Sequence, residues 1–330
     1  MKPLSKVFCG HNKPQLEGFN WAEQNRVFFR EIFPELITDA ANDAGTPLTL
    51  MIDLDLTLCL YNPNPEDVYM EPACYNALKE LIAMKLPNLR IVAITGRPIS
   101  KALEMLNGLD VELIGDHGCI KLHKDGIQEI IDLPEEVGSN KDKAYSALME
   151  ILSSLTESQK KAIIVENKGI CLGFKITDPN AFEKEEVKTL IANVRKKFGD
   201  FIIPEVTKVN FESPLEAELR PVKGKLQGAE FFEKWGTPKW MGSAVFFGDS
   251  MGKTGTDYEI AKAVGAYENG YVVQVGASRP NTSCAPAEDI HLSALCFAPQ
   301  GLGKQLQAML SAIRNLPLIH LGASMDTEPS

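Results

Sequence analysis

The chain has 330 residues, 44% of them hydrophobic and 24% charged, which is the composition of a globular protein large enough for two domains. Its formal net charge of −10 provides no basic face for a phosphate backbone, so a nucleic-acid partner is not expected. No apolar run has the length of a signal peptide core or a membrane span, so a cytoplasmic location is expected, although export without a signal peptide would leave no mark in the sequence.

The seven cysteines are scattered along the chain, and no two of them form a Cys-x-x-Cys pair. An odd number of cysteines without metal-binding spacing is typical of reduced thiols in a cytosolic protein. We therefore expect no structural zinc site.

Residues 1–46 are expected to form an arm followed by a helix that packs on the main fold. Asn20-Trp-Ala-Glu23 matches a capping box, and four large apolar residues then recur at helical spacing: Phe28, Phe29, Ile32 and Phe33. Pro34 is expected to kink or end this helix. The aromatic face could bind a partner or a membrane, but packing on the core is the simpler interpretation.

The first candidate site is Asp53-Leu-Asp55, which follows the apolar run 48–52. A buried parallel strand delivers such side chains to its carboxyl end, where open α/β sheets bind ligands. A divalent cation would keep the first carboxylate ionised and nucleophilic, while the second could exchange a proton with a leaving group. Asp-x-Asp pairs are also common in solvated loops, so this pattern alone leaves both interpretations open.

The apolar strands at 89–95, 111–114, 244–248 and 270–276 extend the α/β pattern, and a hairpin is expected to turn at Asp125-Gly126. Residues 134–219 have a different pattern of expected helices and strands. Helices are expected at 140–155 and 180–198, and strands at 161–166, 170–177, 201–206 and 210–220. Such an insert between two halves of a core is the pattern of a lid.

Asp53-Leu-Asp55-Leu-Thr57-Leu58 resembles the first motif of the haloacid dehalogenase (HAD) superfamily, Asp-x-Asp-Gly-Thr-Leu, with Leu56 in place of Gly. Thr95, followed by Gly96-Arg97, matches the second motif, in which a hydroxyl group hydrogen-bonds a phosphate oxygen.

The later motifs follow in the order that the superfamily has. Lys223-Gly224 is the better match to the third-motif lysine, and Lys225 is the alternative. Asp249 and Asp257 match the first and last acids of Gly-Asp-Asp-x-Thr-Asp, where Ser250 replaces the second acid. The resemblance implies a Rossmannoid three-layer core at 47–133 and 220–330 and an inserted α+β type 2 cap at 134–219.

Two segments resemble the trehalose-6-phosphate phosphatases of this superfamily. Gly115-Asp-His117-Gly118 is similar to their Glu-His-Gly segment, and Val165-Glu166-Asn-Lys168-Gly169 is similar to their cap motif. That family then has His-x-Arg, where this chain has Lys175-Ile-Thr177.

The resemblance implies a Mg²⁺-dependent phosphomonoester hydrolase that acts through an aspartyl phosphate. The implied catalytic residues are Asp53, Asp55, Thr95 and Lys223; the substrate-binding residues are Thr57, Gly96, Arg97, His117, Glu166, Lys168 and Glu218; and the Mg²⁺ ligands are Asp53, Asp55, Asp249 and Asp257. The favoured partner is a small sugar phosphate. The alternatives are a phosphotyrosine-protein phosphatase and a catalytically inactive binding module on the same fold.

Overall fold

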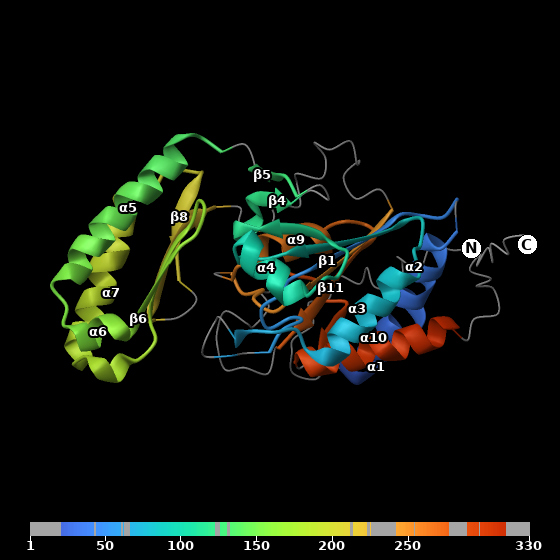
Figure 1. Cartoon of the computed structure of the whole chain (residues 1–330). Helices are drawn as coiled ribbons and strands as arrows, with labels where there is room; N and C mark the ends of the chain where they lie inside the picture. Colours follow the sequence, from blue (N-terminus) through green and yellow to red (C-terminus); the bar gives the residue numbers. More distant parts are fainter. Residues whose placement is uncertain are drawn as a thin grey trace, which may run out of the picture.

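The computed structural model describes residues 21–42, 44–60, 62, 67–122, 126–130, 133–211, 214–222, 225, 242–253, 255–276, 289–296 and 298–314. These residues form a larger and a smaller α/β unit, which lie side by side (Figure 1). The smaller unit comprises residues 136–221, and each unit has its own sheet and hydrophobic core.

The larger unit is built on an eight-stranded sheet with the order β12-β11-β10-β1-β2-β3-β4-β5. The first six strands are parallel and the last two are antiparallel. Their bounds are β1 Leu48–Ile52, β2 Leu89–Ile94, β3 Glu112–Gly115, β4 Ile120–Leu122, β5 Gln128–Ile130, β10 Ser243–Gly248, β11 Gly270–Val275 and β12 Ala294–Cys296. The predicted parallel α/β core is confirmed, and β4 and β5 form the expected hairpin, although Asp125 lies outside the described residues.

Helices cover both faces of this sheet, because its central strands are apolar on both sides. Helices α3 (Pro72–Ala83), α4 (Ile99–Leu106) and α10 (Pro299–Arg314) contribute to the core on one face. Helix α9 (Tyr258–Gly265) packs on the other face. The result is a three-layer arrangement that leaves the carboxyl-terminal edge of the parallel strands for a site.

The N-terminal helices belong to the first of these cores. Helix α1 (Trp21–Val27) continues through a π-helical turn, Phe28–Ile32, into α2 (Phe33–Ala40), so the helix passes Pro34 by widening instead of ending. Phe33 lies 5.9 Å from Phe247 of β10 between ring centroids. The aromatic side chains therefore face the interior, and within the described ranges no helix has the length and apolar character needed to cross a bilayer.

The smaller unit is a four-stranded antiparallel sheet with the order β6-β7-β9-β8. Its elements are α5 Glu136–Ser153, α6 Glu157–Lys161, β6 Ile163–Asn167, β7 Leu172–Ile176, α7 Lys184–Gly199, β8 Thr207–Asn210 and β9 Glu216–Pro221. Helices α5 and α7 lie on the outer side of the sheet, whose other face is turned towards the larger unit (Figure 1). Alternate residues therefore point to the helices or to the space between the units.

Two expected strands differ from the structure. The strand expected at 210–220 is divided, since Asn210 ends β8, residues 214–215 form a turn and β9 covers only Glu216–Pro221. The other expected strand is wrong. Residues 201–206 form turns, and the strand β8 begins only at Thr207. Pro204 has no N–H for a ladder, and Glu205 has a φ of 63°, which a strand cannot accommodate.

Candidate active site

Strand β1 delivers Asp53 to the carboxyl-terminal edge of the main sheet. The chain adds β2 and β3 on one side of β1 and β10 to β12 on the other, so the strand order reverses here. The Asp53 N–H donates to the Phe247 carbonyl of β10 at 2.9 Å, and the residue is 2% exposed. A ligand that reaches this edge would meet a fixed, buried carboxylate.

Lys225 joins two of the buried carboxylates. Its Nζ lies 2.5 Å from Asp53 Oδ1 and 2.6 Å from Asp257 Oδ1, and no member of the trio is more than 3% exposed. The sequence favoured Lys223 for this position, but Lys223 lies outside the described residues. Lys225, the alternative, is the lysine that lies beside Asp53.

These three charges are strongly coupled. Burial lowers the pKa of Lys225, but Asp257 and Asp53 outweigh it and hold that pKa above its ordinary value, so Lys225 stays protonated. Burial and the nearby Asp257 and Asp55 carboxylates raise the pKa of Asp53, whereas Lys225 lowers it. A second cation would therefore favour the ionised, nucleophilic form of Asp53.

The cluster offers oxygen ligands of the kind that Mg²⁺ prefers. Asp53, Asp249 and Asp257 each contribute a carboxylate oxygen, and these oxygens lie within 4.8 Å of one another. However, both Asp257 oxygens are engaged, since Oδ1 accepts from Lys225 and Oδ2 accepts from the backbone N–H groups of Asp249 and Ser250 at 3.0 and 3.1 Å. Asp257 therefore also fixes the loop that carries Asp249, and its expected role as a metal ligand stays a prediction.

Gln274 is a site residue that the motifs did not indicate. Its side chain is fully buried in β11, and Nε2 donates to the Asp249 carbonyl at 2.6 Å. The available signal was a lone amide within the apolar run 270–276. Such a group needs a buried partner, and here it fixes the backbone of a proposed metal ligand.

Asp55 is bound by Arg97, which follows β2. The guanidinium approaches both carboxylate oxygens, with Nη2 2.7 Å from Oδ1 and Nε 3.0 Å from Oδ2. The Asp55 side chain is 37% exposed, so it reaches the solvent side of the site that Asp53 does not. Directly after Asp55, Leu56 has a φ of 60°, the left-handed conformation that a glycine adopts freely and that costs a leucine about 1 kcal/mol.

Two predicted hydroxyl groups lie behind these carboxylates. Thr57 Oγ1 donates to Asp53 Oδ2 at 3.4 Å, and Thr95 Oγ1 accepts from the Arg97 N–H at 3.1 Å. Both threonines are fully buried. Position 96, next to Thr95, requires a glycine for steric reasons, because a Cβ there would lie 2.5 Å from the His117 ring.

A second polar cluster joins the two units. His117 Nε2 lies 2.9 Å from Glu218 Oε1 of β9, and Lys168 Nζ lies 3.1 Å from Glu166 and 3.6 Å from Glu218. Burial lowers the pKa of His117, so the ring is neutral at pH 7. Burial alone would raise the pKa of Glu218, but His117, Lys168 and Arg220 together hold it below its ordinary range. Because His117 is neutral, the lysine and the arginine are the cations that keep Glu218 ionised.

Replacing Asp116, which lies beside His117, by a neutral residue is expected to increase stability in a pH-dependent way. Asp116 is 2% exposed with a φ of 49°, and its Oδ1 has no hydrogen-bond partner in the described part of the chain. Burial raises its pKa from 3.8 to about 6, so the folded state binds this proton more tightly than the unfolded state and stability falls as pH rises through that range. Asp116→Asn, which tolerates the same φ, should raise the free energy of unfolding at pH 7.5 by up to about 3 kcal/mol.

Urea unfolding of both proteins between pH 4.5 and 7.5 checks this expectation. The gain should shrink towards pH 4.5, because the wild-type carboxyl is then also neutral in the folded state. A gain that is equal at both pH values would show that titration of Asp116 is not its cause.

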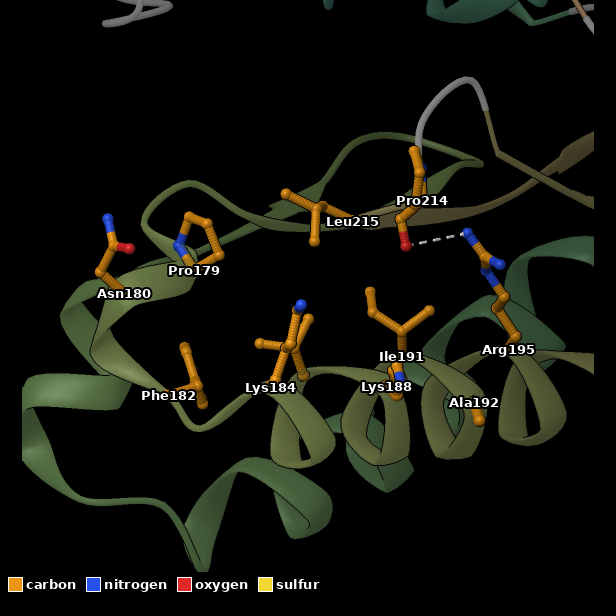
Figure 2. Close-up of a pocket in the computed structure, with 11 residues that line it drawn as sticks. Pro179, Asn180, Phe182, Lys184, Lys188, Ile191, Ala192, Arg195, Pro214 and Leu215 are labelled. Atoms are coloured by element: carbon orange, nitrogen blue, oxygen red, sulfur yellow. Dashed lines mark hydrogen bonds between the residues drawn. The ribbon is translucent and has the colours of Figure 1, made fainter.

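A cavity of about 540 Å³ opens between the units, over the carboxylate cluster. It brings together most of the predicted site residues, namely Asp53, Asp55, Gly96, Arg97, His117, Glu166, Lys168, Glu218 and Asp249, along with Lys225. Thr57, Thr95 and Asp257 do not line it. A larger hollow of about 790 Å³ runs along α7 in the smaller unit, where Arg195 donates to the Pro214 carbonyl (Figure 2). Among the described residues, none that line this hollow carries a carboxylate, so we place the chemistry in the cavity between the units.

No family model matches the chain, and no curated protein matches it. Solved structures do. The chain superposes on the C-terminal domain of the Candida albicans trehalose-6-phosphate phosphatase with a TM-score of 0.60 and 16% identity, covering 84% of this chain and 96% of that one. A trehalose-6-phosphate phosphatase related protein gives 0.55 and 16% identity over 81% and 100% of the two chains. The C-terminal domain of the Candida albicans trehalose synthase regulatory protein gives 0.58 and 10% identity over 84% and 97%.

At these identities the similarity concerns the fold, and it includes both a phosphatase and a protein described as regulatory. Activity must therefore be argued from the side chains of this chain. The comparison does agree with the fold that the sequence motifs imply. The chain has the fold that is found in the solved trehalose-6-phosphate phosphatase structures.

Proposed function

We propose that the protein is a phosphomonoester hydrolase that forms an aspartyl phosphate on Asp53. The observation that carries the proposal is the buried trio of Asp53, Lys225 and Asp257 at the carboxyl end of β1, with Asp55 exposed to the cavity beside it. A fixed ammonium group next to a carboxylate suits the transfer of an anionic phosphoryl group.

In the first step, an Asp53 oxygen forms a bond to phosphorus as the ester P–O bond breaks, and Asp55 gives its proton to the leaving alcohol. In the second step, Asp55 takes a proton from water, the water oxygen bonds to phosphorus, and the Asp53–phosphorus bond breaks. Arg97 orients Asp55, and Lys225, which lines the cavity, would hold a phosphate oxygen. Thr95, which the resemblance implies for the same role, is fully buried outside the cavity lining and would need the bound phosphate to reach it. Mg²⁺, bound by Asp53, Asp249 and the Asp55 carbonyl, would supply positive charge that offsets the phosphate oxygens.

Mg²⁺ is expected to stabilise the folded protein. Binding relieves repulsion among the buried carboxylates, and at a concentration 100 times the Kd it adds about 2.7 kcal/mol to the free energy of unfolding. Millimolar Mg²⁺ should therefore raise the Tm of the wild type, and Asp249→Ala should remove the rise. Asp289→Ala is the matched control, because this aspartate is exposed and pairs with Tyr258 and Lys262 on the surface. An unchanged wild-type Tm would contradict the proposed metal site.

We further propose that the smaller unit is the cap that selects the substrate. The face it turns to the cavity carries Glu166, Lys168 and Glu218, which are ionic groups that can bind hydroxyl groups. A sugar phosphate suits these ionic groups. A phosphotyrosine ring would instead use apolar side chains that also line the cavity, among them Ile164, Phe211 and Leu215.

A panel of phosphate esters, assayed with and without Mg²⁺, tests the proposed function. Trehalose 6-phosphate, hexose phosphates and phosphotyrosine peptides are compared by kcat/KM. We expect Mg²⁺-dependent hydrolysis with a preference for sugar phosphates. Preference for the peptides would replace the substrate assignment, and no hydrolysis of any ester would favour an inactive binding module.

A further inference from the structure

Four residues form a row across the cavity face of the smaller sheet. Register pairs Glu166 with Gly173, Gly173 with Glu218, and Glu218 with Asn210, so the row crosses β6, β7, β9 and β8 in order. Residues that are paired in this way present their side chains on the same face. We call these four residues the polar row, and all of them line the cavity of about 540 Å³.

Both carboxylates of the polar row have partners within the protein. Glu166 is paired with Lys168 at 3.1 Å, and Glu218 is bound to His117 at 2.9 Å. Gly173 leaves room between them, since a Cβ at this position would lie 3.3 Å from Glu166 Oε2. The carboxylates are thus held in place by cations and a ring before any ligand binds.

Asn210 is different. It is only 7% exposed, yet its carboxamide makes no hydrogen bond to any residue in the described ranges. The carboxamide is not among the fully buried polar atoms without a partner, so water or a ligand in the cavity can supply the hydrogen bonds that the described residues do not. Because Asn210 lines the cavity, its carboxamide can hydrogen-bond to a ligand or to water in the cavity.

We propose that Asn210 is a specificity-determining residue that binds hydroxyl groups of the leaving alcohol, an inference that rests on the proposed phosphatase function. A carboxamide both donates and accepts, as a sugar hydroxyl does, and it carries no charge. Thr177, at the position where the resembled family has arginine, donates its hydroxyl to the Ala162 carbonyl at 3.1 Å. Asn210 on the edge strand therefore provides a polar contact that Thr177 does not.

The test compares Asn210→Leu with the wild type on trehalose 6-phosphate and on p-nitrophenyl phosphate, an ester without leaving-group hydroxyls. Leucine has a similar size and no hydrogen-bonding group. We expect the ratio of the two kcat/KM values to fall about tenfold, through a higher KM for the sugar ester at similar kcat. Asn210→Thr restores a hydroxyl donor and acceptor in a residue that suits a strand, and it should recover part of the ratio.

Asn180→Leu is the matched control, because Asn180 lines the hollow along α7 instead of the cavity (Figure 2). Asn180→Leu should leave both kcat/KM values within about twofold of those of the wild type. If Asn210→Leu leaves the ratio unchanged, or if Asn210→Thr recovers nothing while its Tm equals that of the wild type, the role of Asn210 is wrong and the phosphatase assignment stands. If the wild type hydrolyses neither ester, both the proposed function and the inference about Asn210 are wrong.

Discussion

Asp53→Asn should lower kcat on an aryl phosphate at least a thousandfold while the protein keeps its fold. The amide oxygen is a poor nucleophile and cannot form the acyl phosphate, so the covalent route is lost. Lys225 retains Asp257 as a buried partner in this variant, and the carboxylate repulsion decreases. The Tm should therefore be no lower than that of the wild type.

Steady-state hydrolysis of p-nitrophenyl phosphate, together with circular dichroism, measures both effects. Asp142→Asn is the control, since Asp142 lies on the outer helix α5 with its side chain 72% exposed. Near wild-type turnover by Asp53→Asn would exclude Asp53 as the nucleophile.

Lys225→Met should abolish hydrolysis and also lower the free energy of unfolding by about 3 to 5 kcal/mol. The reason is that Asp53 and Asp257 would remain buried, close together and without their shared cation. The loss should be smaller at low pH, where these carboxyls can be protonated. The double variant Lys225→Met/Asp53→Asn should recover part of the stability and none of the activity.

Lys262→Met is the matched control, because its salt bridge to Asp289 lies on the surface with the lysine side chain 49% exposed. It should leave the free energy of unfolding close to that of the wild type, because exposed ion pairs contribute little. Lys223→Met separates the two sequence alternatives. If it abolished turnover while Lys225→Met did not, the role that we assign to Lys225 would be wrong.

The core of the fold could be predicted because its strands are strongly apolar. The runs that became β1, β2 and β10 are short, buried on both sides and followed by polar residues, which is the pattern of parallel strands. Sequence order then indicated which polar residues share the edge of the sheet. Asp53 and Asp55 were predicted in this way, whereas Arg97 and Asp249 were implied by the resemblance to the HAD motifs, and all four line the cavity.

Details that depend on a single residue step could not be predicted. Lys223 and Lys225 both fit the third motif, and only the contacts of the folded chain distinguish a lysine that reaches Asp53. The sequence predicted one strand over 210–220, which placed Asn210 and Glu218 on the same strand, whereas in the structure they are cross-strand partners on β8 and β9. A shift by one residue would turn the Asn210 side chain to the other face.

The backbone conformation at two places could not be predicted from the sequence either. The left-handed Leu56 keeps the motif's loop without the usual glycine, because the surrounding structure stabilises a conformation that leucine rarely adopts. The helix around Pro34 continues through a π-helical turn, since burial of Phe28 and Phe33 outweighs the missing backbone donor.

The most direct test of the account is to look for the phosphoryl group on Asp53. The protein is mixed with p-nitrophenyl phosphate and Mg²⁺, quenched in acid during turnover, digested and examined by peptide mass spectrometry. We predict one phosphoryl group on the peptide that contains Asp53, and none in the Asp53→Asn variant. Turnover without phosphorylation of that peptide, or phosphorylation at another residue, would contradict the proposed mechanism.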